Sequence, residues 1–275
     1  MLVSSAILHK GRPYMDGVLP STIFDLDATI AASTDGASQT WSNLIAAPAD
    51  GAAQSAYDFY RGADAGVSTD DPAFNGSAGG SAAYWSVDGG DYFNTTLGTN
   101  TDFLKKLHKD DVYDWWLAVA FRTPSSFGNT HNGLFGSIGN GSLNGIRLLY
   151  LATSDVIRLN RCTTAGTVNT DVVGTGAIAT STDYLLIVSF QKNTLALKAW
   201  LNARTASFSG ASSALTSPGD CASPHNVMAG GNGGGNAASS GFRCYGISMG
   251  AEFLDDARAG LILNHYNARH GRFYA

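Results

Sequence analysis

The run Trp115-Trp116-Leu117-Ala118-Val119-Ala120-Phe121 decides the fold class of this 275-residue chain. It completes an aromatic-rich segment, residues 112–121, that is typical of a strand buried on both faces at the centre of a sheet. No longer apolar run occurs in the sequence. A membrane-spanning helix needs about 20 apolar residues, so we expect no membrane insertion.

A short helix is predicted near residues 101–110, immediately before this strand. Thr101 or Asn100 can cap it, and Phe103, Leu104 and Leu107 fall on one face of the helix. The apolar face would pack against the same core as the strand that follows.

After the central run, short apolar segments alternate with turns at intervals of roughly 8–14 residues. Even spacing of this kind indicates a sandwich or a barrel rather than alternating βα units. Strands are predicted near residues 132–138, 145–152, 156–162, 167–173, 182–191, 195–202, 203–208, 227–229 and 241–253. A closing helix is predicted near residues 256–269, with Asp255 or Asp256 as its cap and Gly271 at its end.

The N-terminal third is less regular. Residues 1–20 are interpreted as an arm, because Gly and Pro interrupt regular structure there. Residues 50–80 are rich in Ala, Gly, Asp and Ser and predict a long surface loop. Residues 83–93, centred on Asp88-Gly89-Gly90-Asp91, predict a strand, a tight turn and a second strand. Further strands are expected near residues 23–26 and 40–45.

The composition agrees with a β protein. The chain contains 33 Gly, only 14% charged residues and six Lys, and Glu252 is the single Glu among 22 acidic residues. Glu and Lys favour helices, whereas Gly, Asp, Ser, Thr and Asn favour turns, so helical bundles, coiled coils and doubly wound nucleotide-binding folds are disfavoured. The net charge of −5, with no large basic cluster, disfavours nucleic acid as a partner.

The order of these elements resembles the concanavalin A-like (laminin G-like) jelly-roll modules of bacteriophage virion and bacterial surface proteins. The resemblance covers roughly residues 21–274. It implies an all-β, two-sheet antiparallel sandwich at 21–275, preceded by the arm, and it implies no reaction, because lectins, glycan hydrolases and adhesion modules share this fold. The motifs that carry it are Phe24-Asp25-Leu26-Asp27-Ala28-Thr29, Thr40-Trp41-Ser42-Asn43-Leu44, the 85–93 turn and Tyr266-Asn267-Ala268-Arg269-His270-Gly271.

A catalytic role is not expected. Glycan hydrolysis needs two carboxyl groups at a defined separation, and the resemblance implies a strand with two Glu, which this sequence lacks. Asp pairs could substitute in principle, for example Asp25 with Asp27, which share a strand face. Glu252 lies at a strand-to-helix junction where capping explains it. The sequence also lacks a nucleophile elbow, and the glycine run 230–235 lacks the helix and Lys of a phosphate loop.

No cofactor is expected, and calcium is the alternative. Asp88 and Asp91 flank a tight turn and offer the oxygen ligands that Ca²⁺ prefers, although turn formation explains them equally. Three cysteines at wide spacing are interpreted as reduced, buried thiols, and a Cys221–Cys244 disulfide stays open as the alternative. The three are Cys162, Cys221 and Cys244.

Sugar recognition would need polar groups for the hydroxyls and an exposed aromatic ring for stacking. The loops 128–132 and 230–236 are the preferred patch, and turn chemistry is the alternative role of their amides. The candidate ligand-binding residues are Asn129, His131, Asn132, Asn232 and Asn236. The candidate stacking rings are Tyr57, Tyr60, Phe74 and Trp85.

These observations favour a non-enzymatic structural or adhesion protein of a phage-like virion, assembled in the host cytoplasm. It would display a lectin-like sandwich for attachment to host surface glycan, as a homo-oligomer, because weak single sites gain from multivalency. The alternative is a capsid or tail assembly or decoration subunit whose sandwich packs only on other virion proteins, with residues 1–20 as the contact. A glycan hydrolase comes third.

Overall fold

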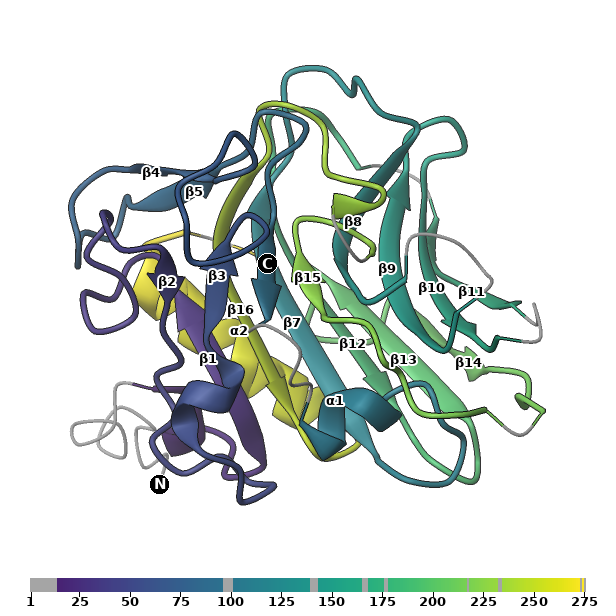
Figure 1. Ribbon diagram of the computed structural model, residues 1–275. Coiled ribbons are helices and arrows are strands. Elements are labelled where there is room, and N and C mark those ends of the chain that lie inside the picture. Colours follow the sequence, from purple (N-terminus) through teal and green to yellow (C-terminus); the bar gives the residue numbers. More distant parts are fainter. Residues whose placement is uncertain are drawn as a thin grey trace, which may run out of the picture.

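The computed structural model describes residues 14–95, 101–138, 143–164, 168–175, 178–216, 218–231, 234–272 and 274. Within these ranges, sixteen strands form two antiparallel sheets of eight strands each, with one long helix on the outer side of one sheet (Figure 1). The predicted all-β, two-sheet sandwich with a short helix and a C-terminal helix is confirmed. Neither α-helix in the described ranges is long and apolar enough to cross a membrane.

Sheet A carries the central run at its middle. Its strand order is β14-β13-β12-β7-β16-β5-β4, and β1 pairs with the C-terminal half of β16 beside β5. The bounds are β1 Thr22–Asp27, β4 Ala73–Asn75, β5 Tyr84–Ser86, β7 Trp115–Arg122, β12 Asp183–Phe190, β13 Ala196–Leu201, β14 Phe208–Ala211 and β16 Arg243–Gly250.

Sheet B faces the inner side of sheet A. Its order is β11-β10-β9-β8-β15-β6-β3-β2. The bounds are β2 Thr40–Trp41, β3 Phe59–Arg61, β6 Phe93–Thr95, β8 His131–Gly136, β9 Gly145–Leu151, β10 Val156–Cys162, β11 Val168–Thr175 and β15 Asn226–Val227. The short strands β2 and β3 therefore form one edge of this sheet, far along it from β11.

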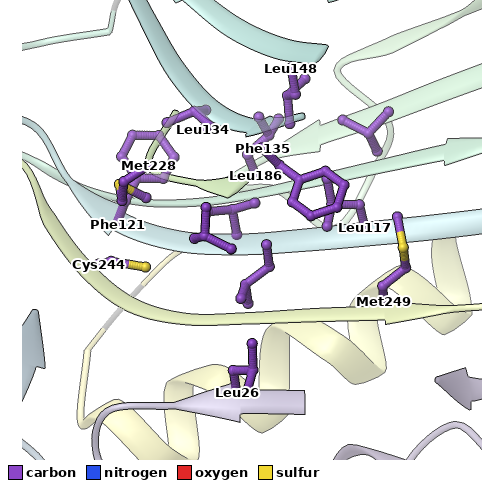
Figure 2. Packing of buried hydrophobic residues seen from close by; sticks show 14 of the residues in the cluster. Leu26, Leu117, Phe121, Leu134, Phe135, Leu148, Leu186, Met228, Cys244 and Met249 are labelled. Atoms are coloured by element: carbon purple, nitrogen blue, oxygen red, sulfur yellow. The ribbon is translucent and has the colours of Figure 1, made fainter. Parts of the chain in front are cut away.

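Strand β7 explains how the layers assemble. Leu117, Val119 and Phe121 point into the core between the sheets, where Figure 2 shows Leu117 and Phe121 with side chains of sheet B. Ala118 and Ala120 point to the opposite face, into a second cluster beneath the long helix. Small side chains on that face let a helix approach the sheet closely, so the predicted burial on both faces is correct.

Two α-helices form where the sequence predicts them. Helix α1, Asp102–Lys106, is capped by the Thr101 side chain, which accepts a hydrogen bond from the backbone N–H of Leu104 at 3.3 Å. Helix α2, Asp256–His270, is capped by Asp255 and ends at Gly271, whose φ of 58° is left-handed. The buried side of α2 covers the outer face of sheet A with Ala259, Ile262, Leu263 and Tyr266.

A buried ion cluster fastens α2 to β1. Arg269 donates from Nη2 to Asp25 Oδ2 at 2.9 Å and from Nη1 to Asp27 Oδ2 at 2.9 Å, and His270 Nε2 lies 3.2 Å from the same Asp27 oxygen. Burial opposes the ionisation of Asp27, but His270, Arg269 and Thr29 outweigh it and lower the pKa of this carboxyl. The same two carboxylates raise the pKa of Arg269 although burial acts in the opposite direction.

The prediction of a long surface loop at residues 50–80 is wrong in part. This segment contains the 3-10 helix η3, Gln54–Tyr57, and the strands β3 and β4. Tyr57 and Phe59 are fully buried in the core and anchor this segment. The small residues around them in the sequence gave no indication of that burial. The last strand predicted before residue 209 is also shifted, because β14 pairs with β13 only over Phe208–Ala211.

The N-terminal arm lies partly outside the described residues, which begin at Tyr14. A 3-10 helix, η2 Met15–Gly17, follows, and Met15 and Leu19 are buried with the α2 cluster. The backbone N–H of Met15 donates to Asp25 Oδ2 at 3.1 Å, so this part of the arm packs on the domain itself.

The backbone of Ala229, Gly230 and Asn236, which follow β15, lies directly on strand β8 of sheet B. The backbone N–H of Gly133 in β8 donates to the carbonyl of Asn236 at 2.8 Å. A Cβ atom at Gly133 would collide with backbone atoms of Ala229, Gly230 and Asn236. Glycine is thus required in β8 because two stretches of the chain's own backbone approach each other closely.

We predict that Gly133→Ala lowers the free energy of unfolding by about 3 kcal/mol, because the colliding atoms are backbone and cannot rotate away. The matched control is Gly128→Ala, where an added Cβ has nothing within 4 Å, and its effect should stay within about 0.5 kcal/mol. Urea denaturation of the three proteins measures both values, and equal stabilities would contradict the close approach.

A second prediction concerns His265 on the buried side of α2, whose ring faces Asp25, Asp27, Arg269, His270 and Tyr266. Burial, aided by Arg269, lowers its pKa from 6.5 to about 4. The unfolded chain therefore takes up a proton first as the pH falls below 6.5, so stability is lost from there down to about pH 4.

His265→Leu should make the loss of unfolding free energy between pH 7 and pH 5 smaller by about 2 kcal/mol than in the unmodified protein. Other titrating groups act equally in both proteins and cancel in this difference. The exposed Leu261→Ala on the same helix serves as the control, since it removes no titratable group and should keep the pH dependence of the unmodified protein. The same pH dependence with and without His265 would contradict the burial of a neutral ring.

Candidate functional site

The loop patch favoured by the sequence is assembled, but its amides hold the two loops together. Asn129 donates from Nδ2 to the carbonyl of Ala237 at 3.0 Å, and its backbone N–H donates to Ser239 Oγ at 2.9 Å. Asn132 is fully buried, accepts from the backbone N–H of Ser239 at 2.8 Å and donates to the carbonyl of Asn129 at 2.8 Å. Asn132 therefore presents no polar atom to a ligand.

The other members of the patch differ in their surroundings. His131 is exposed at the start of β8. Asn236 has a left-handed φ of 57°, and its carbonyl receives the hydrogen bond from Gly133. Asn232 lies outside the described residues. The alternative role that the sequence left open, turn and loop chemistry, accounts for Asn129, Asn132 and Asn236.

Asp88 and Asp91 form a closed turn between the sheets, because β5 belongs to sheet A and β6 to sheet B. The backbone N–H of Asp88 donates to Asp91 Oδ2 at 2.9 Å, and that of Gly90 donates to Asp88 Oδ1 at 3.1 Å. Burial, with the neighbouring Asp88 carboxyl, raises the pKa of Asp91 to about 7. The described part of the chain contains no group of three His, Cys, Asp or Glu that could hold a metal ion, so turn formation is the role that these contacts support.

The candidate hydrolytic pair, Asp25 and Asp27, lies in the ion cluster beneath α2 and is fully buried. Glu252 accepts from Ser21 Oγ at 2.7 Å and pairs with Arg258 at 3.1 Å, so it too has a structural role. The three cysteines are free and buried, as predicted, and burial raises the pKa of each thiol. The alternative Cys221–Cys244 disulfide does not form.

Two adjoining polar hollows lie beside the β2 edge of sheet B, and the sequence did not indicate them. We call them the Ser42 hollows, because Ser42 lines both. The first has a volume of about 340 Å³, at the lower end of the range for small-molecule sites, and the second about 210 Å³. The first is lined by Ser42, Asn43, Gln54, Ser55 and Asp58, and the second by Ala31, Ala32, Ser33, Thr34, Asp35, Ser38, Thr40 and Ser42.

Asn43 fixes the floor of the first hollow. Its Oδ1 accepts from the backbone N–H groups of Asp25 at 3.0 Å and Ile45 at 3.1 Å, and its own backbone N–H donates to Asp58 Oδ1 at 2.7 Å. Gln54 adds a further hydrogen bond to the same residue, since its Nε2 donates to the carbonyl of Asn43 at 2.6 Å. The lining is therefore held by hydrogen bonds to β1, which the core already positions.

Ser33 gives the second hollow the same kind of support. Its Oγ donates to the carbonyl of Ser42 at 2.7 Å and accepts from the backbone N–H of Asp27 at 3.1 Å. The Asp35 carboxylate accepts from the backbone N–H groups of Ser38 and Ala37, which lowers the pKa of this carboxyl. Burial raises the pKa of Asp58, although its hydrogen bond from Asn43 opposes the change.

Several lining groups are available to a ligand. The hydroxyls of Thr40, Ser42 and Ser55 make no hydrogen bond to any residue that the structure describes, and the same holds for the side-chain carbonyl of Gln54. Tyr60 lies opposite Thr40 in the β2–β3 pair and is half-buried, with the cross-strand spacing that brings such side chains into contact. Hydroxyl, amide and carboxylate groups beside a tyrosine ring can bind a polyhydroxylated molecule.

Of the four stacking rings that the sequence offered, only Tyr60 occupies such a position. Tyr57 and Trp85 are fully buried in the core, so their expected exposure is wrong. Phe74 packs edge-on against Trp85 at 5.0 Å between ring centroids. Tyr57 and Trp85 fill the space between the sheets. No periodicity in the sequence distinguished these buried rings from Tyr60, which is half-buried.

Comparisons with known proteins concern the fold. No protein-family model matches the sequence, and no curated protein matches it. Solved structures do match. Botulinum neurotoxin type C, whose cell entry depends upon interaction with two ganglioside molecules, superposes with a TM-score of 0.61 at 10% identity, over 92% of this chain and 53% of the other.

Two further structures give the same picture. The binding domain of botulinum neurotoxin serotype D matches with a TM-score of 0.58 at 10% identity, over 90% of this chain and 52% of the other. The Trypanosoma rangeli sialidase matches with a TM-score of 0.53 at 11% identity, over 90% of this chain and 33% of the other. This chain thus spans about half of the neurotoxin chains and a third of the sialidase chain. The likeness confirms the concanavalin A-like sandwich that the sequence resemblance predicted.

Proposed function

We propose that this protein is a non-enzymatic carbohydrate-binding module that holds a glycan in the Ser42 hollows. The observation that carries the proposal is the set of available groups there, three hydroxyls and one amide carbonyl, together with the half-buried Tyr60, which is the cross-strand neighbour of Thr40. Almost all side chains of this lining are polar, which suits a sugar and disfavours a lipid or another apolar ligand.

The fold is compatible with this function. The neurotoxin that shares the sandwich interacts with two ganglioside molecules, but the match covers only 53% of that chain and carries the fold, not the position of a binding site. The contacts of the candidate hydrolytic carboxylates support a non-enzymatic role. Asp25 and Asp27 are buried against Arg269, and Glu252 is paired with Arg258, so each has a structural partner.

The biological setting is a further part of the proposal. We propose that the module acts in adhesion to host surface glycan on a phage-like virion assembled in the host cytoplasm, as a homo-oligomer. The sequence resemblance to bacteriophage modules supports this setting. A capsid or tail assembly or decoration subunit, attached through residues 1–20, is the competing function and predicts no glycan binding.

A glycan array probed with the full-length protein tests the proposal. We expect binding to a defined group of glycans, and Tyr60→Ala should weaken it about tenfold, equivalent to about 1.4 kcal/mol, because the stacking surface is lost. Gln54→Ala should weaken it by a similar factor. His131→Ala in the loop patch is the matched control and should bind normally, with thermal unfolding confirming that all variants fold.

Two results would contradict the site or the function. Binding that depends on His131 and not on Tyr60 or Gln54 would move the site to the loop patch. No binding to any glycan by the folded protein, together with attachment to particles through residues 1–20, would favour the assembly subunit.

Metal removal gives an independent prediction. Because the lining of the Ser42 hollows offers two carboxylates on separate hollows, Asp58 and Asp35, we expect glycan binding to be equal in calcium and in EDTA. Titration of the array signal against EDTA measures this. Loss of binding that calcium restores would contradict a metal-independent site.

A further inference from the structure

Charge is distributed very unevenly along the chain. Residues 13–104 contain twelve Asp and one basic residue, Arg61, whereas the whole chain carries a net charge of only −5. The remainder of the chain is therefore net positive. The Ser42 hollows lie entirely within the acidic part.

The one basic residue of this part is turned away from the hollows. Arg61 lies on the inner face of β3, with its guanidinium carbon 5.2 Å from the Trp85 ring centroid, and its Nε donates to the carbonyl of Pro72 at 3.0 Å. The described residues that line the hollows include no Lys, Arg or His, and their charged members are Asp35 and Asp58.

An acidic loop adds to the negative potential. Residues 62–71 carry Asp64, Asp70 and Asp71, and the loop is joined to the β2 edge by Gln39, which precedes Thr40. Gln39 donates from Nε2 to Asp71 Oδ2 at 2.6 Å and to the carbonyl of Gly66 at 2.9 Å. Asp71 of this loop is thus held against Gln39, the residue next to Thr40 of the second hollow, and adds to the negative charge on this side of the molecule.

We propose that the Ser42 hollows take uncharged glycans and reject glycans that carry carboxylate or sulfate groups. Recognition of such anions relies on Arg or Lys, which form charge-assisted or bidentate hydrogen bonds, and the lining offers neither. An anion seated there would instead face Asp35, which two backbone N–H groups hold in its ionised form. This inference rests on the proposed glycan-binding function and narrows its ligand class.

Matched glycan pairs test the inference. The full-length protein is applied to an array on which each glycan is present both with and without its terminal sialic acid, and each sulfated glycan beside its unsulfated form. We expect the uncharged member of a bound pair to bind at least tenfold more strongly at about 20 mM salt, and the preference to shrink at about 500 mM salt.

Charge-removing variants show whether the lining is responsible. Asp35→Asn keeps the oxygen that accepts from Ala37 and Ser38 and should reduce the preference about threefold or more. Asp111→Asn, an exposed residue between α1 and β7, removes the same charge outside the hollows and should leave the preference unchanged. Thermal unfolding checks that both variants are folded.

Equal or stronger binding of the sialylated and sulfated members would overturn the inference while leaving the proposed function intact. An equal effect of Asp35→Asn and Asp111→Asn would also overturn it, because the preference would then reflect net charge alone. Absence of binding to every glycan would overturn the proposed function and the inference with it.

Discussion

The structure depends on the fact that both faces of β7 are apolar, so neither face can be left exposed to water. One row of its side chains needs the second sheet, and the other row, with Ala118 and Ala120, needs a closely packed helix. Helix α2 meets that need only if it is held on sheet A. The Arg269 bridge to Asp25 and Asp27 holds its C-terminal end there, in a buried setting where loss of one partner would leave an uncompensated charge.

The same strand that anchors α2 positions the candidate site. On one side of β1, the Asp25 carboxylate binds Arg269, and on the other its backbone N–H binds Asn43 in the first hollow. Asp27 has an equivalent double role through Arg269 and Ser33. The buried cluster is therefore connected through one strand to the lining of the Ser42 hollows, and the acids that hydrolysis would require instead fix the site in place.

The sequence predicted regular elements better than the site, for physical reasons. The central run, the capping by Thr101 and Asp255 and the Gly271 stop are local signals, and the structure has all of them. The prediction of a loop at residues 50–80 is wrong in part because the burial of Tyr57 and Phe59 depends on contacts with residues distant in the sequence. The Ser42 hollows have no local signal at all, since Ser, Gln and Asn recur throughout the chain and only the fold selects which of them meet.

The loop patch and the Ser42 hollows show why residue type alone is a weak guide to a binding site. Asn132 has the chemistry that a sugar requires, but its amide oxygen joins two loops by accepting from Ser239, and its Nδ2 closes its own loop by donating to Asn129. Ser42 and Thr40 have less distinctive side chains, yet their hydroxyls stay available because the hydroxyls of Ser33 and Ser38 bond their backbone groups instead. In a sandwich whose loops are tied together by amides, hydrogen-bonding capacity that the fold does not use is the better indicator of where a ligand binds.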